Sequence, residues 1–176
     1  MADNFKERFS QAVKETETVV YSYLPEETGH QKTIFEAMNY SVKAGGKRLR
    51  PLLMREVYRL FGGNGPEIEP FMAAMEMIHT SSLIHDDLPC MDNDEYRRGK
   101  LTTWKAYGYD MAVLAGDALM IYAFETASKA FSMGADPAKV GRAIGILAEK
   151  TGIYGMIGGQ TVDVELTGKA IPREKL

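Results

Sequence analysis

The chain has 176 residues, which suits one ordinary domain with a single apolar core. Its formal net charge of -3 argues against a surface that binds nucleic acid. A single cysteine, Cys90, cannot form an internal disulfide, and the N-terminus carries acids and lacks the apolar core of a secretory signal. We therefore expect a cytoplasmic protein.

Apolar residues recur at helical spacing along the chain, and no convincing strand alternation is present. They begin with Phe5, Phe9, Val13 and Val20 and continue with Ile34, Met38 and Val42. Gly45 and Gly46 can end one helix, and Pro51 fits the first turn of the next. Helices with short connections predict an all-α fold, an antiparallel bundle.

Later signals extend the same pattern toward the C-terminus. Residues 62–66 form a glycine-rich turn, and Asp136-Pro137 suits the start of a later helix. The best candidate for a membrane span, residues 111–124, is too short and is interrupted by Asp117. We therefore expect no stable membrane insertion.

Three carboxylates follow an apolar helical stretch at Asp86, Asp87 and Asp92, and the pair Arg97-Arg98 comes shortly after them. Carboxylate oxygens suit Mg²⁺, which is usually shared with a substrate's phosphates, and arginines bind phosphate oxygens through paired hydrogen bonds. Pro89 should end the helix, so that a short loop returns Asp92 toward Asp86. The alternative is a solvated acidic helix end, although carboxylates normally favour the other end of a helix.

Cations gather in a second place, the segment 45–51, which holds Lys47, Arg48 and Arg50 between two glycines and a helix-starting proline. Such a turn can bind an anion, or it can be a solvated basic turn. His79 lies seven residues before Asp86, nearly in line on one helix face and roughly 10 Å away. It could line the same cavity as Asp86, or be an ordinary half-buried histidine.

Together these segments resemble the trans-isoprenyl diphosphate synthase family, whose short-chain members make farnesyl and geranylgeranyl diphosphate. The matching motifs, in family order, are GGKRLRP at 45–51, EMIH at 76–79, SLIHDDLPCMDND at 82–94, RRGK at 97–100, AGDAL at 115–119 and GGQ at 158–160. The family fold is all-α, with helices around a central cavity. The resemblance therefore implies the isoprenoid synthase fold and head-to-tail condensation of isopentenyl diphosphate with an allylic diphosphate.

The resemblance also implies roles for individual residues. Asp86 and Asp92, assisted by Asp87, resemble the aspartate-rich motif that binds Mg²⁺, and Arg97 resembles the arginine on the allylic diphosphate. The remaining substrate-binding residues are then Lys47, Arg50, His79 and Arg98 for isopentenyl diphosphate, and Gln160 and Asp163 near the allylic substrate.

Product length is implied by the residue five before the first motif aspartate, which forms the floor of the elongation pocket in the family. Here it is Ser81, followed by Ser82. Small residues at a floor admit a longer tail, which favours a twenty-carbon product over a fifteen-carbon one.

The family normally carries a second aspartate-rich motif downstream, which residues 1–176 do not contain. We therefore expect the N-terminal part of a single all-α domain, incomplete at the C-terminus and inactive alone. Two alternatives stay open: a non-catalytic truncated or partner subunit of a prenyl synthase, and a class I terpene cyclase, which needs no second diphosphate site. A homodimer is expected from the resemblance, with the apolar helix at 111–131 as one surface for it.

Overall fold

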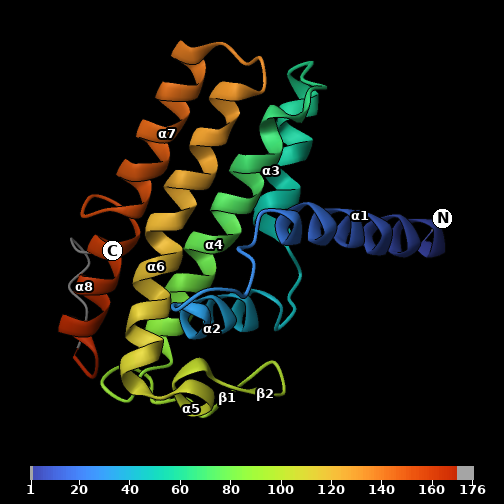
Figure 1. Cartoon of the computed structure of the whole chain (residues 1–176). Coiled ribbons are helices and arrows are strands. Elements are labelled where there is room, and N and C mark those ends of the chain that lie inside the picture. Colours follow the sequence, from blue (N-terminus) through green and yellow to red (C-terminus); the bar gives the residue numbers. More distant parts are fainter. Residues whose placement is uncertain (1, 170–176) are drawn as a thin grey trace. The chain divides into compact units, whose positions relative to one another are not determined.

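The computed structural model describes residues 2–169, and apart from one short hairpin their regular structure is helical (Figure 1). The chain divides into two compact units, one ending at Asp136 and one beginning at Pro137. The helices of the first unit are α1 (Ala2–Ser22), α2 (Lys32–Val42), α3 (Leu49–Leu60), α4 (Glu69–Asp86), α5 (Thr103–Tyr107) and α6 (Tyr109–Ser128), with short 3₁₀ turns at Pro66–Ile68 and Lys129–Ser132. The sequence prediction of an all-α fold is confirmed. That both units belong to a single domain stays a prediction.

Helix α4 is the centre of the first unit, because it packs against α1, α2, α3 and α6. It buries Met72 and Met77 completely, and α6 opposes it with Leu119 and with a row of fully buried alanines. Small side chains let two helix backbones approach closely. Because both helices pack against neighbours on several sides, neither has one sharply defined apolar face. The two helices therefore hold the end of α4, where the aspartates lie, on a rigid support.

Gly116 marks a close approach between α6 and α4. A Cβ atom added there would collide with the ring of His85, the residue before Asp86. Replacing a helical glycine by alanine normally stabilises a protein by about 1 kcal/mol. At Gly116 the steric overlap should outweigh this gain, so that the substitution destabilises.

We expect Gly116→Ala to destabilise the protein by about 1–3 kcal/mol, because His85 must leave its place. Thermal unfolding followed by circular dichroism measures the effect. Gly141→Ala is the matched control, because nothing lies within 4 Å of a Cβ at that helical position and the same substitution should stabilise or be neutral there. Equal melting temperatures for Gly116→Ala and the wild type would contradict the collision.

By length and composition alone, one described segment, Tyr109–Ser132, could cross a membrane. The expectation that no apolar stretch is long enough is therefore corrected, since α6 and the turn after it continue beyond residue 124. Core helices satisfy the same criterion, and α6 packs against α4, α2 and α5. The absence of membrane insertion stays a prediction.

A small antiparallel hairpin, β1 (Tyr96–Arg97) with β2 (Lys100–Leu101), was not expected from the sequence. Its two turn residues, Arg98 and Gly99, both have positive φ, at 54° and 77°. Two-residue turns with positive φ match the natural twist of paired strands. Strands of two residues are too short to show alternation, which is why the pattern was missed.

The second unit contains α7 (Pro137–Thr151) and α8 (Met156–Leu166), which pack against each other. Helix α7 begins at Pro137, as the Asp136-Pro137 pair predicted. A tight turn through Gly152 and Gly155 separates the two helices.

Candidate functional site

The acidic loop, residues 86–92, begins where α4 ends. The helix stops at Asp86, three residues before Pro89, as predicted. The chain then turns back, so that the backbone N–H of Asp92 donates to the carbonyl oxygen of Asp86 at 2.9 Å. The N–H groups of Met91 and Asn93 both donate to the carbonyl oxygen of Leu88. The predicted return of Asp92 to the helix end is therefore confirmed.

We call Asp86 and Asp92 the acid pair, because the charge of Asp92 acts on Asp86. Partial burial raises the pKa of Asp86 above its ordinary value, and the negative charge of Asp92 raises it further. Arg97 acts in the opposite direction but does not cancel these two effects. A cation placed between the two carboxylates would relieve this repulsion.

Asp87 faces a different partner from the acid pair. It is buried and accepts hydrogen bonds from Nε of Arg97 at 2.8 and 3.0 Å, and Nη2 of Arg97 lies 2.6 Å from Oδ1. Burial raises the pKa of Asp87 and Arg97 lowers it, and with the charges of Asp94 and Asp92 the net direction is upward. The structure thus pairs Asp87 with Arg97, whereas the sequence assigned them to the metal and to the allylic diphosphate. Those two assignments stay predictions.

Among residues 2–169, no group of three or more His, Cys, Asp or Glu side chains is arranged to hold a metal ion. Asp87 is paired with Arg97, so we consider Asp86 and Asp92 as the carboxylates that could bind a metal ion. Mg²⁺ commonly uses only one or two protein carboxylates and takes its other ligands from water and substrate phosphates. The acid pair, with its hard oxygen donors and with the pKa of Asp86 raised, fits such an ion.

A second feature, which we call the basic cavity, has a volume of about 450 Å³. Lys47 and Arg50 from the segment before and at the start of α3, His79 from α4 and Arg98 from the hairpin all line it. Nη1 of Arg50 lies 3.4 Å from Nε2 of His79. The four residues assigned to isopentenyl diphosphate, separated by up to 51 positions, therefore line one cavity.

The hairpin contributes one arginine to each side of this arrangement. Arg97 pairs with Asp87 beside the acid pair, and the next residue, Arg98, donates to the carbonyl oxygen of Gly45 in the basic cavity. A Cβ on Gly46 would lie 2.7 Å from the guanidinium of Arg98, so glycine is needed for this approach. The hairpin thus connects the acidic loop with the segment that carries Lys47.

His79 is half-buried, and its pKa is lowered by burial first and by the positive charge of Arg50 second. Because the unfolded chain holds this proton more tightly, the stability contributed by His79 rises as pH increases from the lowered folded value toward about 6.5. A bound diphosphate would reverse the balance, because its negative charge favours the protonated ring.

We therefore expect pyrophosphate to raise the pKa of His79 and to bind more tightly as pH falls from 7.5 to 6. The expected gain is at most tenfold per unit of pH, since one proton is taken up. NMR titration of the His79 ring with and without pyrophosphate measures the shift directly, and His30, an exposed histidine, serves as the internal control. An unchanged His79 pKa at saturating ligand would place the anion elsewhere.

The two serines assigned to the elongation floor differ in position. Ser81 is completely buried and donates from Oγ to the carbonyl oxygen of Ile78 at 2.8 Å. Ser82 is half-buried and lies one helical turn before Asp86, on the same face of α4. A side chain at Ser82 can therefore reach the space next to the acid pair more directly than one at Ser81.

Gln160 and Asp163 lie in α8, in the second unit. They share one face of this helix, being three residues apart. Their assignment to the allylic substrate stays a prediction.

Sequence reasoning missed two residues of the basic cavity, Arg48 and Glu76. Both are buried, and Nη1 of Arg48 lies 2.8 Å from Oε1 of Glu76. The segment 45–51 was noticed for its cations, but sequence alone does not separate a buried arginine from its exposed neighbours. The one available signal was that Glu76 precedes His79 by a single helical turn.

Comparison with solved structures identifies the class of protein. The apo structure of an FPP/GFPP synthase from Zymomonas mobilis superposes with a TM-score of 0.88 and 40% identity, covering 98% of this chain and 62% of that one. A geranyltransferase from Legionella pneumophila superposes equally well, at 34% identity over 97% of this chain and 60% of that one. The fold is therefore that of the all-α isoprenoid synthases.

The sequence places the chain more narrowly. A model of the polyprenyl synthetase family matches residues 31–174, and the chain belongs to that family. The heterodimeric geranylgeranyl pyrophosphate synthase large subunit 1, chloroplastic, of Arabidopsis thaliana is 53% identical over 136 residues, which are 77% of this chain and 37% of the relative. A dimethylallyltranstransferase of Fischerella ambigua (strain UTEX 1903) is 47% identical over 78% of this chain and 40% of that one. The chain thus spans less than half the length of these curated relatives.

Proposed function

We propose that the protein transfers prenyl groups, condensing isopentenyl diphosphate with an allylic diphosphate to give a short-chain trans-prenyl diphosphate. One observation carries the proposal: α4 brings His79, in the basic cavity, and Asp86, in the acid pair, onto a single rigid helix. Two diphosphates held at two chemically different sites are what this condensation needs. The names of the relatives, which are prenyltransferases, support the same reaction.

The basic cavity is proposed as the site of isopentenyl diphosphate. Lys47, Arg50 and Arg98 supply positive charge, and His79 adds a proton donor when a diphosphate raises its pKa. Arginine and lysine together suit an anion with several oxygens, since the first binds it in paired fashion and the second acts as a point charge. Binding here requires no metal ion.

The acid pair is proposed as the site of the allylic diphosphate, with Mg²⁺ as cofactor. Bound by Asp86 and Asp92, the ion would neutralise the charge that the leaving diphosphate gains. Arg97 lies close enough to Asp86 to lower its pKa, so its positive charge also acts at this site. The pair Asp87–Arg97 then fixes the loop on which the arginine lies.

The proposed reaction breaks the bond between C1 of the allylic group and its diphosphate oxygen, and the electron pair leaves with the diphosphate. The double bond of isopentenyl diphosphate attacks C1, forming the new carbon–carbon bond. A proton is then lost from C2 of the former isopentenyl unit to the departing diphosphate, which restores a double bond. In this reaction the side chains hold both diphosphates in place and stabilise their negative charge.

The proposal is tested by incubating the protein at its full natural length with isopentenyl diphosphate, geranyl diphosphate and Mg²⁺. Mass spectrometry should find prenyl diphosphates lengthened by five carbons, with isopentenyl diphosphate consumed in proportion. A hydrocarbon formed from the allylic substrate alone would instead identify a terpene cyclase. No conversion under conditions where both substrates bind would favour a non-catalytic subunit.

The twenty-carbon product is proposed over the fifteen-carbon one, because a small residue, Ser82, occupies the face of α4 beside the acid pair. We expect Ser82→Tyr to shift the product toward fifteen carbons, since an aromatic ring would block the space for a longer tail. Product ratios from mass spectrometry measure the shift. Ser81→Tyr is the comparison, and its buried position should make it destabilising. An unchanged ratio in Ser82→Tyr would place the floor on another helix.

A homodimer in the cytoplasm is proposed for the assembly and location. One relative is named as the large subunit of a heterodimeric synthase, so a hetero-oligomer is the alternative for the assembly. Size-exclusion chromatography with light scattering distinguishes a dimer from a monomer that needs a different partner.

A further inference from the structure

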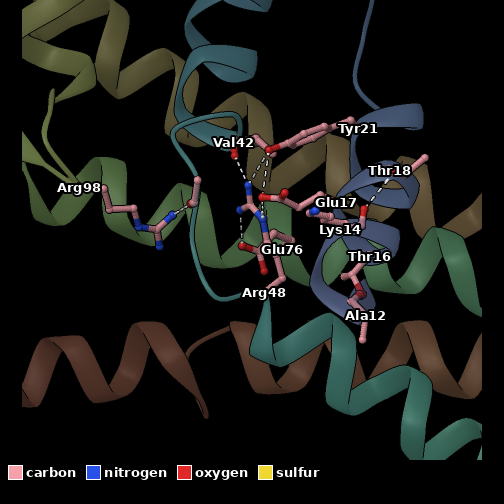
Figure 2. Close-up of polar contacts among 11 residues, drawn as sticks. Ala12, Lys14, Thr16, Glu17, Thr18, Tyr21, Val42, Arg48, Glu76 and Arg98 are labelled. Atoms are coloured by element: carbon pink, nitrogen blue, oxygen red, sulfur yellow. Dashed lines mark hydrogen bonds and ion pairs between the residues drawn. The ribbon is translucent and has the colours of Figure 1, made fainter. Parts of the chain in front are cut away.

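Arg48 is the one arginine of the segment 45–51 whose side chain is completely buried. Figure 2 shows its guanidinium enclosed by groups from three parts of the chain. It donates to Oε1 of Glu76 at 2.8 Å, to Oε1 of Glu17 at 3.2 Å and to the hydroxyl of Tyr21 at 3.0 Å. A fourth bond goes to the carbonyl oxygen of Val42 at 2.8 Å. Four of the five N–H groups of the guanidinium therefore donate hydrogen bonds inside the protein.

The backbone of Arg48 has an unusual conformation. Its φ of 48° and ψ of 32° are left-handed, and it is the N-cap residue of α3. Left-handed angles are unfavourable for a residue with a Cβ, so they persist where the surroundings impose them. The four hydrogen bonds of the side chain supply that constraint. They thereby fix the directions in which the neighbours on either side, Lys47 and Leu49, leave the turn.

Glu76 connects this turn to the opposite wall of the basic cavity. It lies on α4 one turn before His79, its side chain is 3% exposed, and both Glu76 and Arg48 contribute to the cavity lining. Lys47 and Arg50, by contrast, are exposed. The ion pair of Arg48 and Glu76 thus sets the distance between the turn that carries Lys47 and Arg50 and the helix that carries His79.

We propose that Arg48 is a positioning residue for the diphosphate site. Through Glu76 on α4 and through Glu17 and Tyr21 on α1, it holds the turn at 45–51 so that Lys47, Arg50 and His79 face one bound diphosphate. Its own charge is offset by the two glutamates and does not serve the ligand. The inference rests on the proposed function of the basic cavity and adds a residue that acts on the ligand only through others.

The geometry of the network explains why arginine is needed. Its four acceptors surround a planar group, and a lysine ammonium has only three donors at a single point. Arg48→Lys would therefore keep the charge while losing the simultaneous contact with α1, α4 and the end of α2. This variant separates positioning from long-range attraction, because only the former depends on the shape of the donor.

The test is isothermal titration calorimetry of the whole chain with inorganic pyrophosphate and with isopentenyl diphosphate, well below the melting temperature of every variant. We expect Arg48→Lys to weaken both affinities by about 10-fold or more, by analogy with residues that orient the ligands of a metal ion. Lys47→Ala should weaken both affinities because it removes a direct contact with the ligand. Tyr21→Phe, which removes one acceptor and keeps both ion pairs, should weaken them by about half that factor on a logarithmic scale.

Arg55→Lys is the matched control. Arg55 is also a largely buried arginine that joins α3 to α1, through Glu15 at 3.4 Å, and it does not line the basic cavity. Both arginine variants should lower the melting temperature, and only Arg48→Lys should lower the affinity for pyrophosphate. If Arg48→Lys does not fold, the affinity of Tyr21→Phe for pyrophosphate tests the proposal in its place.

Two results would overturn the proposal in distinguishable ways. If Lys47→Ala loses affinity while Arg48→Lys and Tyr21→Phe keep wild-type affinity, the cavity binds diphosphate and the network is only structural. If the wild-type chain binds neither pyrophosphate nor isopentenyl diphosphate, the proposed function of the cavity fails, and the positioning role fails with it.

Discussion

Replacing Asp86 by asparagine should lower prenyl transfer by roughly 10²–10³-fold, the effect of removing one group that stabilises developing charge. The amide keeps the shape of the side chain and removes the negative charge that the acid pair offers to a divalent cation. Steady-state turnover at saturating Mg²⁺ measures the loss in the protein at its full natural length.

Stability should respond in the opposite direction. Because burial and Asp92 raise the pKa of Asp86, its negative charge is unfavourable in the folded protein, and the neutral amide should leave the melting temperature unchanged or higher. Glu7→Gln, at an exposed carboxylate on α1, is the control and should change neither quantity. Near-normal turnover in Asp86→Asn would contradict the proposed role of the acid pair in the reaction.

Replacing Asp87 by asparagine should destabilise the fold by about 2–3 kcal/mol, although it is the neighbour of Asp86. The pKa of Asp87 is raised by burial as well, but here the substitution leaves Arg97 without the buried counter-charge that it contacts at 2.6–3.0 Å. Breaking a buried ion pair is costly, and the value stays below the upper range because the side chain of Arg97 is 31% exposed. Chemical denaturation with urea measures the free energy of unfolding.

The two adjacent aspartates are each other's control. Asp86→Asn should reduce activity and preserve stability, whereas Asp87→Asn should reduce stability first. A double substitution, Asp87→Asn with Arg97→Gln, should recover part of the lost stability, since no unpaired charge is left behind. Equal stability for Asp87→Asn and the wild type would show that the pairing at 2.6–3.0 Å contributes little.

Features written in local sequence could be predicted. Pro89 predicted the end of α4, and the spacing of Asp86 and Asp92 required the loop that the structure shows. Helical periodicity predicted the all-α fold, and Pro137 predicted the start of α7. The convergence of Lys47, Arg50 and His79 was implied by resemblance to a family, because no local pattern brings such distant residues together.

Features that depend on which side chains are buried together could not be predicted. Lys47, Arg48 and Arg50 are equivalent cations in the sequence, and only the packing of α1 and α4 makes Arg48 the buried one. Similarly, three aspartates near two arginines allow several pairings, and the folded chain pairs Asp87 with Arg97. Tertiary contacts, which leave no periodic signal, decide these cases.

Calorimetric titration with two ligands tests the central claim, that α4 supports two separate diphosphate sites. Isopentenyl diphosphate should bind without Mg²⁺. Its affinity should fall more than tenfold in Lys47→Ala and stay unchanged in Asp92→Asn. A non-ionising allylic diphosphate analogue should bind only with Mg²⁺, lose affinity in Asp92→Asn and keep it in Lys47→Ala. If both variants weakened both ligands equally, or if both ligands competed for one site, the two-site account would be contradicted.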